Sequence, residues 1–260
     1  MAGFLLFRST KERPVKNGKN LLASHNQTLA KLLGCLLALV AIGHGSEAAI
    51  LTVTDTGDTI EIDGLVTLRE AITSANNNAD VNADVVGIGA YGIDTINFNI
   101  AGIGVHTIAP SAVLPPITDP VTIDGYTQPG GAANTQPTGD DAVLLIELSG
   151  VNAGEVNGLT IMAGSSTVRG LVINGFAGSS GGAGNAIVLN DGSDNVIERN
   201  FLGTDASGRA ALPNENNAIR IESGSNVNLV GGTAPSARNV ISGNGKGGLV
   251  CRHSRQRYPR

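Results

Sequence analysis

The residues best suited to chemistry in this 260-residue chain are the acidic pair Asp140–Asp141 and the triplet Arg220-Ile221-Glu222. Two carboxylates can act as general acid and base on a glycosidic bond when they are held at a defined separation. The aspartates follow Gly139 in a segment rich in Pro, Gly and Thr, which is typical of an irregular loop. We therefore expect this pair to be solvated or to form a turn.

The other acidic residues are dispersed along the repeats described below. If equivalent positions of neighbouring repeats lie about 5 Å apart, as in stacked parallel strands, any cluster of acids would show in the alignment. Each aligned position contains a single acid: Met162/Asn190/Glu222, Ala163/Asp191/Ser223 and Ser166/Asp194/Asn226. The sequence therefore predicts no row of carboxylates.

Nucleophile and metal motifs are also weak. A Ser-His-Asp triad would have to use His106, and no serine lies in a Gly-x-Ser-x-Gly elbow, so we interpret His106 as a surface or turn residue. The segment 181–186 approaches a calcium-binding nonapeptide, but Ala186 occupies the position of the aspartate ligand. We assign no catalytic, cofactor-binding or metal-ligating residue and expect no cofactor.

The charge balance restricts the partners. Between Ala49 and Gly245 there are six arginines, no lysine and 20 of the 22 acidic residues, a formal charge of −14. Nucleic acids and anionic membranes are bound by clustered Lys and Arg, so neither is expected as a partner. The two cysteines, Cys35 and Cys251, lie in the apolar run near the N-terminus and in the last ten residues. The region between them therefore contains no disulfide, thiolate nucleophile or zinc-thiolate site.

The segment 1–48 resembles a signal peptide. An eleven-residue apolar run, Leu32–Ile42, follows several basic residues and precedes Ser46-Glu47-Ala48, whose small residues suit cleavage before Ala49. Cys35 lies inside the apolar run, where we interpret it as a small hydrophobic residue. The long basic segment leaves open an extended signal or a misplaced start codon. The expected location is secreted or cell-surface, with no membrane span after cleavage.

The second half of the chain is built from repeats. Three segments align without a gap: Gly158–Ser165, Ala186–Ser193 and Ala218–Ser225. Their spacing of about 30 residues is typical of a solenoid or propeller. Short apolar strands separated by Gly, Asn and Ser turns predict two strands per repeat and an all-β fold, a right-handed parallel β-helix in which Ile161, Leu189 and Ile221 stack.

A second motif appears twice, as Asp194–Asn200 and Arg238–Asn244. We expect its asparagines to be structural, because Asn tolerates left-handed turns and its amide can bond to a counterpart in the next coil. Further strands are expected at 95–100, 106–108, 120–124 and 142–148, so that the coils run from 84 to 250. The loop from Tyr126 to Asp141 is expected to project outward without strand pairing.

Residues 49–83 are expected to form an N-terminal cap. Thr67 and Glu70 form a capping box ahead of an amphipathic helix over residues 68–76, whose apolar stripe is Leu68, Ala71, Ile72 and Ala75. A helix at this position would cover the first coil of the solenoid.

Thr52–Thr56, followed by Val66-Thr-Leu-Arg-Glu-Ala-Ile72, resembles the CSLREA domain that opens many bacterial surface β-helix proteins. Val66 and Thr67 replace the Cys and Ser of that name. The segments 120–130 and 231–244 are also similar to recurrent segments of this group, so the resemblance covers roughly residues 50–250. It implies the architecture and a surface location, and it implies no shared active site.

A weaker resemblance concerns carbohydrate-active β-helix enzymes. Gly139-Asp140-Asp141 is similar to the paired aspartates of polygalacturonases, and Arg220-Ile221-Glu222 loosely resembles their Arg-Ile-Lys. The companion histidine motif is missing, and Glu222 reverses the expected charge.

The last ten residues, 251–260, contain four arginines and depart from the repeat. We expect the strand begun at Gly248 to stop there, and we interpret the segment as a truncated or frame-shifted tail that leaves an open strand edge. A basic binding arm is the alternative.

Together these features predict an exported, non-catalytic, adhesin-like β-helix protein whose partners are glycans or components of cell surfaces and matrix. The alternatives are a carbohydrate-active lyase or hydrolase using Asp140 and Asp141, and a gene remnant without present function.

Overall fold

The computed structural model describes residues 48–252 except 180, 181 and 223. These residues belong to one compact unit. Residues 1–47 of the predicted signal peptide (1–48) and residues 253–260 of the basic tail lie outside the described residues.

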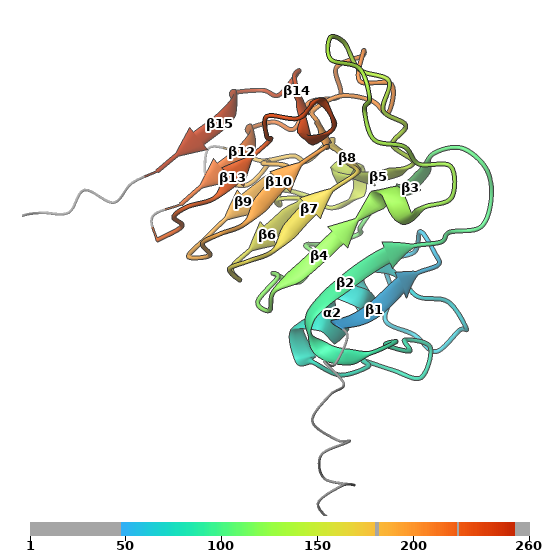
Figure 1. Cartoon of the computed structure of the whole chain (residues 1–260). Coiled ribbons are helices and arrows are strands. Elements are labelled where there is room, and N and C mark those ends of the chain that lie inside the picture. The colour runs from blue at the N-terminus through green and yellow to red at the C-terminus, as the bar shows by residue number, and fades with distance from the viewer. Residues whose placement is uncertain (1–47, 180–181, 223, 253–260) are drawn as a thin grey trace, which may run out of the picture. The chain divides into compact units, whose positions relative to one another are not determined.

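Three parallel sheets form the unit (Figure 1). The first contains, in spatial order, β1 (Ala48–Val53), β2 (Ala90–Phe98), β4 (Val121–Asp124), β7 (Thr167–Arg169), β10 (Val196–Glu198) and β13 (Leu229–Val230). The second contains β14 (Val240–Ile241), β11 (Phe201–Leu202), β8 (Leu171–Asn174), β5 (Ile146–Ser149) and β3 (His106–Ile108). The third contains β15 (Gly247–Cys251), β12 (Asn217–Ile221), β9 (Ile187–Leu189) and β6 (Leu159–Ile161). From β6 onward the chain visits the third, first and second sheets in that order.

The register of the third sheet confirms the predicted stacking. Leu189 pairs with Ile161 on one side and with Ile221 on the other. Ile161 and Leu189 are fully buried and belong to one continuous aliphatic core. The spacing of the repeats in the sequence is therefore the length of chain between adjacent strands of a sheet.

The expectation of two strands per repeat is wrong, because each repeat has three. Within 196–202, Arg199 adopts a left-handed conformation (φ 60°) between the apolar pairs Val196–Ile197 and Phe201–Leu202, which belong to β10 and β11. Gly170 does the same between β7 and β8 (φ 74°), and its N–H donates to the carbonyl of Arg199. Strand β11, the second apolar pair, is only two residues long, and a strand this short has no periodicity that a sequence pattern can detect.

The two copies of the asparagine motif are not equivalent in space. Asp194–Asn200 contains β10 of the first sheet, whereas Arg238–Asn244 contains β14 of the second. As a result Asn200 lies against Asn239, whose Oδ1 accepts the backbone N–H of Asn200 at 2.9 Å. The amide of Asn200 also donates to Oδ1 of Asn239 at 3.3 Å, so side-chain amides do bond across repeats. The expected counterparts Asn195/Asn239 and Asn200/Asn244 do not pair, and none of these four asparagines is left-handed.

An asparagine ladder beside the third sheet shows the same principle. The Oδ1 of Asn157 accepts the side-chain amide of Asn185 at 2.8 Å, and the Oδ1 of Asn185 accepts that of Asn217 at 2.9 Å. The backbone N–H groups of Asn185 and Asn217 donate to the same oxygens. The ladder thus satisfies main-chain donors where the chain turns into each strand.

The predicted helix is present as α2 (Leu68–Asn77) with its capping box. Its apolar stripe is buried in the main core, and the helix packs on β1 and β2 (Figure 1). Strand β1 falls in the segment predicted to be a cap, but it pairs in parallel with β2 and is the edge of the first sheet. The expected strands at 95–100, 106–108 and 120–124 are present; the one at 142–148 begins only at Ile146.

The end of the described chain corrects another prediction. Strand β15 continues through Cys251, which pairs with Ile221, and the N–H of Arg252 donates to the carbonyl of Ile221 at 2.7 Å. Backbone pairing needs no particular side chain, so a change in composition at Cys251 does not by itself end the strand.

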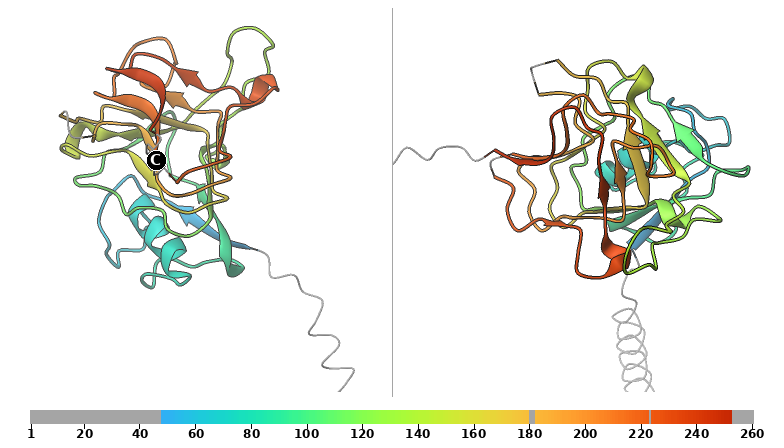
Figure 2. Two further views of the ribbon diagram at one scale, coloured as in Figure 1. Left: turned by 90° about the vertical axis from the view of Figure 1, so that its left-hand side faces the viewer. Right: turned by 90° about the horizontal axis from the view of Figure 1, so that it is seen from above.

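The loop after η1 (Gly125–Thr127) is also more ordered than expected. Ala132 in this loop forms an isolated antiparallel bridge with Val143, just beyond it, so the expectation of no strand pairing fails at this one pair. Asn134 donates to the carbonyl of Pro235 in η3 (Pro235–Ala237), and Arg238 donates to the carbonyls of Pro137 and Gly139. In Figure 2 this loop extends to the C-terminal part of the second sheet.

Asp94 on β2 gives a pH-dependent prediction. Its side chain is fully buried, one of its oxygens has no hydrogen-bond partner among the described residues, and burial raises the pKa of its carboxyl. Between its unfolded and folded pKa values the folded state binds more protons, so stability falls as pH rises. We expect Asp94→Asn to be more stable than the parent protein at pH 7, and this difference to vanish as pH falls below about 4. Urea unfolding at several pH values would measure it; an unchanged difference across pH would contradict the assignment.

Candidate functional site

A groove of about 420 Å³ lies on the outer side of the third sheet. Thr160, Val188 and Arg220, the paired middle residues of β6, β9 and β12, contribute to its lining. Its other lining residues are Asn157, Gly182, Ala183, Asn190 and Glu222. Because parallel strands keep one register, outward residues of successive repeats form a continuous surface.

Arg220 is the central charged group of the groove. Its guanidinium donates to the carbonyl of Gly182 at 2.7 Å and forms an ion pair with Glu222. Its Nε is buried and has no partner among the described residues. The bonds to Gly182 and Glu222 therefore hold the guanidinium in place at the groove.

A second, smaller hollow shares Gly182 and Arg220 with the groove. Lys246 and Arg252 line it together with three asparagines, Asn185, Asn216 and Asn217. The combined lining is polar and positively charged. The chemistry it offers is hydrogen bonding by amides and a hydroxyl, with electrostatic attraction for an anion.

Asp140 and Asp141 form hydrogen bonds to residues of their own loop. The carboxylate of Asp141 accepts the N–H of Thr135 at 2.6 Å and its hydroxyl at 2.7 Å, and also bonds to Gln136. These bonds from Thr135 and Gln136 lower the pKa of Asp141 to about 2. Asp140 accepts the N–H of Ala142. Neither aspartate lines the groove that contains Arg220 and Glu222.

The interpretation of His106 as a surface or turn residue is wrong. It is the first residue of β3, pairs with Ile146 and is only 9% exposed. The strand alternates, so that His106 and Ile108 are buried while Thr107 between them is exposed. Period-two alternation in a three-residue strand is too short to recognise in the sequence.

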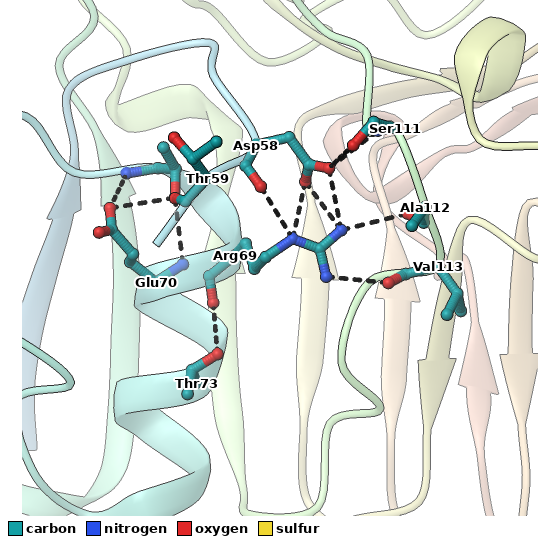
Figure 3. A network of polar contacts seen from close by, with 9 residues as sticks. Asp58, Thr59, Arg69, Glu70, Thr73, Ser111, Ala112 and Val113 are labelled. Atoms are coloured by element: carbon teal, nitrogen blue, oxygen red, sulfur yellow. Dashed lines mark hydrogen bonds and ion pairs between the residues drawn. The ribbon is translucent and has the colours of Figure 1, made fainter. Parts of the chain in front are cut away.

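The Leu-Arg-Glu-Ala segment has a structural role (Figure 3). Glu70 accepts the backbone N–H of Thr67 at 2.8 Å to complete the capping box. Arg69 forms an ion pair with Asp58 and donates to the carbonyls of Ala112 and Val113. Arg69 thus connects the helix to one loop that precedes it and to another that follows it in the sequence.

Many other carboxylates also stabilise local structure. Those of Asp84 and Asp205 accept loop N–H groups, and Asp124 pairs with Arg169 at 2.7 Å. Glu147 bonds to Thr107 and Asn174. Within residues 48–252, apart from 180, 181 and 223, no group of three or more His, Cys, Asp or Glu side chains is placed to hold a metal ion.

Among the same described residues, no helix has the length and apolar character needed to cross a bilayer. Comparisons with protein-family models, with curated proteins and with solved structures found no match.

The sequence does not predict the groove, although two of its lining residues, Arg220 and Glu222, belong to the triplet noted in the sequence. A motif draws attention to Arg220 and Glu222, whereas nothing singles out Asn157, Thr160 or Lys246. The alignment of repeats does place Thr160, Val188 and Arg220 at one position. The hollow itself depends on the loop at Gly182 and Ala183, whose path the repeat pattern does not predict.

Proposed function

We propose that this chain is an exported, non-catalytic, adhesin-like scaffold, a right-handed parallel β-helix of the kind that the CSLREA resemblance implies. The segment 1–48 would direct export and be removed before Ala49. The folded part would present loops and a polar groove to glycans or components of cell surfaces and matrix.

One observation carries this proposal: the repeated path through three parallel sheets around a continuous, largely aliphatic main core. Each added repeat extends all three sheets together, and the resulting surface is rigid and lengthens with repeat number. A scaffold that displays binding surfaces needs this property.

The hydrogen bonds and ion pairs of the carboxylates support the proposal that the protein is not an enzyme. Asp141, Asp58 and Glu222 each bind a cation or several donors of the protein itself. A general acid needs a raised pKa, whereas the bonds around Asp141 lower it. The groove contains one carboxylate, Glu222, and that carboxylate is paired.

Export can be tested by expressing the full chain in a bacterial host and sequencing the N-terminus of protein recovered from the periplasm or medium. We expect Ala49 as the first residue. Full-length protein that stays in the cytoplasm would contradict the proposed export.

The enzymatic alternative is tested by incubating the purified protein with pectin, alginate and chondroitin sulfate. We expect neither unsaturated nor new reducing ends, and the same result for Asp141→Asn. Product formation that Asp141→Asn abolishes would replace the scaffold by a carbohydrate-active enzyme.

A further inference from the structure

Three basic side chains of this acidic protein lie together beside the groove. The described residues contain eight Lys and Arg residues, and three of them, Arg220, Lys246 and Arg252, line the small hollow beside the groove. They come from β12, the turn before β15 and the residue after β15. The stacking of adjacent repeats therefore brings them together.

Most Arg side chains outside the hollow already bind a carboxylate or backbone carbonyls of the protein. Arg69, Arg169 and Arg199 form ion pairs with Asp58, Asp124 and Glu198, and Arg238 bonds to loop carbonyls. Arg220 pairs with Glu222, which lines the groove, while Lys246 and Arg252 of the hollow form no ion pair with a described residue. The hollow thus keeps a net positive charge in a protein that is acidic as a whole.

The rest of the lining indicates the ligand. The groove presents the amides of Asn157 and Asn190 and the hydroxyl of Thr160, groups that both donate and accept hydrogen bonds. Such groups suit a molecule with several hydroxyls. The volume of about 420 Å³ lies within the usual range for a small-ligand site.

We propose that the groove and hollow together form a binding site for an acidic saccharide. The sugar hydroxyls would contact Asn157, Thr160 and Asn190, and a carboxylate or sulfate would bind Arg220, Lys246 and Arg252. This inference rests on the proposed function, since it names the ligand class of the exported scaffold. No aromatic residue among those described lines either part, so hydrogen bonds and charge provide the affinity.

The test is isothermal titration calorimetry of the mature chain with four probes: a galacturonate hexasaccharide, a heparin-derived hexasaccharide, neutral maltohexaose and sodium sulfate. We expect at least one acidic hexasaccharide to bind, with an affinity that falls as salt rises. Lys246→Gln and Arg252→Gln should each weaken it about tenfold, the loss of one charge-assisted hydrogen bond. Arg209→Gln, which removes the same charge from a loop outside the lining, should leave the Kd unchanged.

Three results would overturn the inference: equal affinity for maltohexaose, equal affinity for sulfate alone, or equal weakening by Arg209→Gln. Absence of binding to both acidic probes would also overturn it. That outcome would leave the scaffold proposal standing, because export and the absence of sugar cleavage are measured separately.

Discussion

Replacing Asn200 by alanine is expected to lower the free energy of unfolding by about 3 kcal/mol, because several buried backbone groups would lose their partner. Asn200 is fully buried. Its Oδ1 accepts the N–H of Leu171 at 3.1 Å, and its amide donates to the carbonyls of Val168 and Glu198 at 2.9 and 2.8 Å. Alanine offers neither a donor nor an acceptor to these three backbone groups.

Urea unfolding followed by circular dichroism would measure this loss, with Asn226→Ala as the matched control. Asn226 is exposed, and its amide donates to one carbonyl, that of Gly224. We expect the control to change stability by less than about 0.5 kcal/mol. Amide hydrogen exchange of Leu171 should also become faster in Asn200→Ala. Equal effects of the two substitutions would show that the buried asparagine does not stabilise the corner.

The second large effect is expected for Leu189→Ala, which should cost about 3 kcal/mol. Leu189 is fully buried and lies between Ile161 and Ile221 in the third sheet. Its truncation removes apolar contacts with both neighbouring repeats and leaves a cavity that strands held in register on both sides cannot close.

The same unfolding measurement on Leu229→Ala provides the comparison. Leu229 lies in β13 at the edge of the first sheet and is 51% exposed, so the same substitution should cost less than about 1 kcal/mol. If the two leucine variants unfolded alike, the stacked aliphatic column would not be the main source of stability.

The capping helix is predictable because its signals are local. Thr67 and Glu70 lie one helical turn apart and bond to each other's backbone, and the apolar stripe has the period of a helix. The column of Ile161, Leu189 and Ile221 is predictable for a different reason: a repeat in the sequence compares residues that lie together in space.

The candidate site is predictable only in part. Arg220 and Glu222 attract notice through a motif, and their ion pair holds the arginine in the groove. The contribution of Arg252 could not be predicted, because it depends on a strand that was expected to end before Cys251. No motif in the sequence marks Lys246, which precedes that strand. Asp140 and Asp141 are the best candidates for catalysis in the sequence, but Asp141 stabilises its own loop by bonding to Thr135. That loop also bonds to η3, about 100 residues further along the chain.

The sequence by itself determined the all-β class, the capping helix and the stacking of one sheet, since alternation, capping and repeat period depend on residues close together or regularly spaced. Only the tertiary structure decided that each repeat has three strands, that His106 is buried and that Asn200 faces Asn239. These features depend on single left-handed residues and on which strands pair across a whole repeat of the chain. Pairing of this kind minimises the free energy of the whole stack, so no local pattern encodes it.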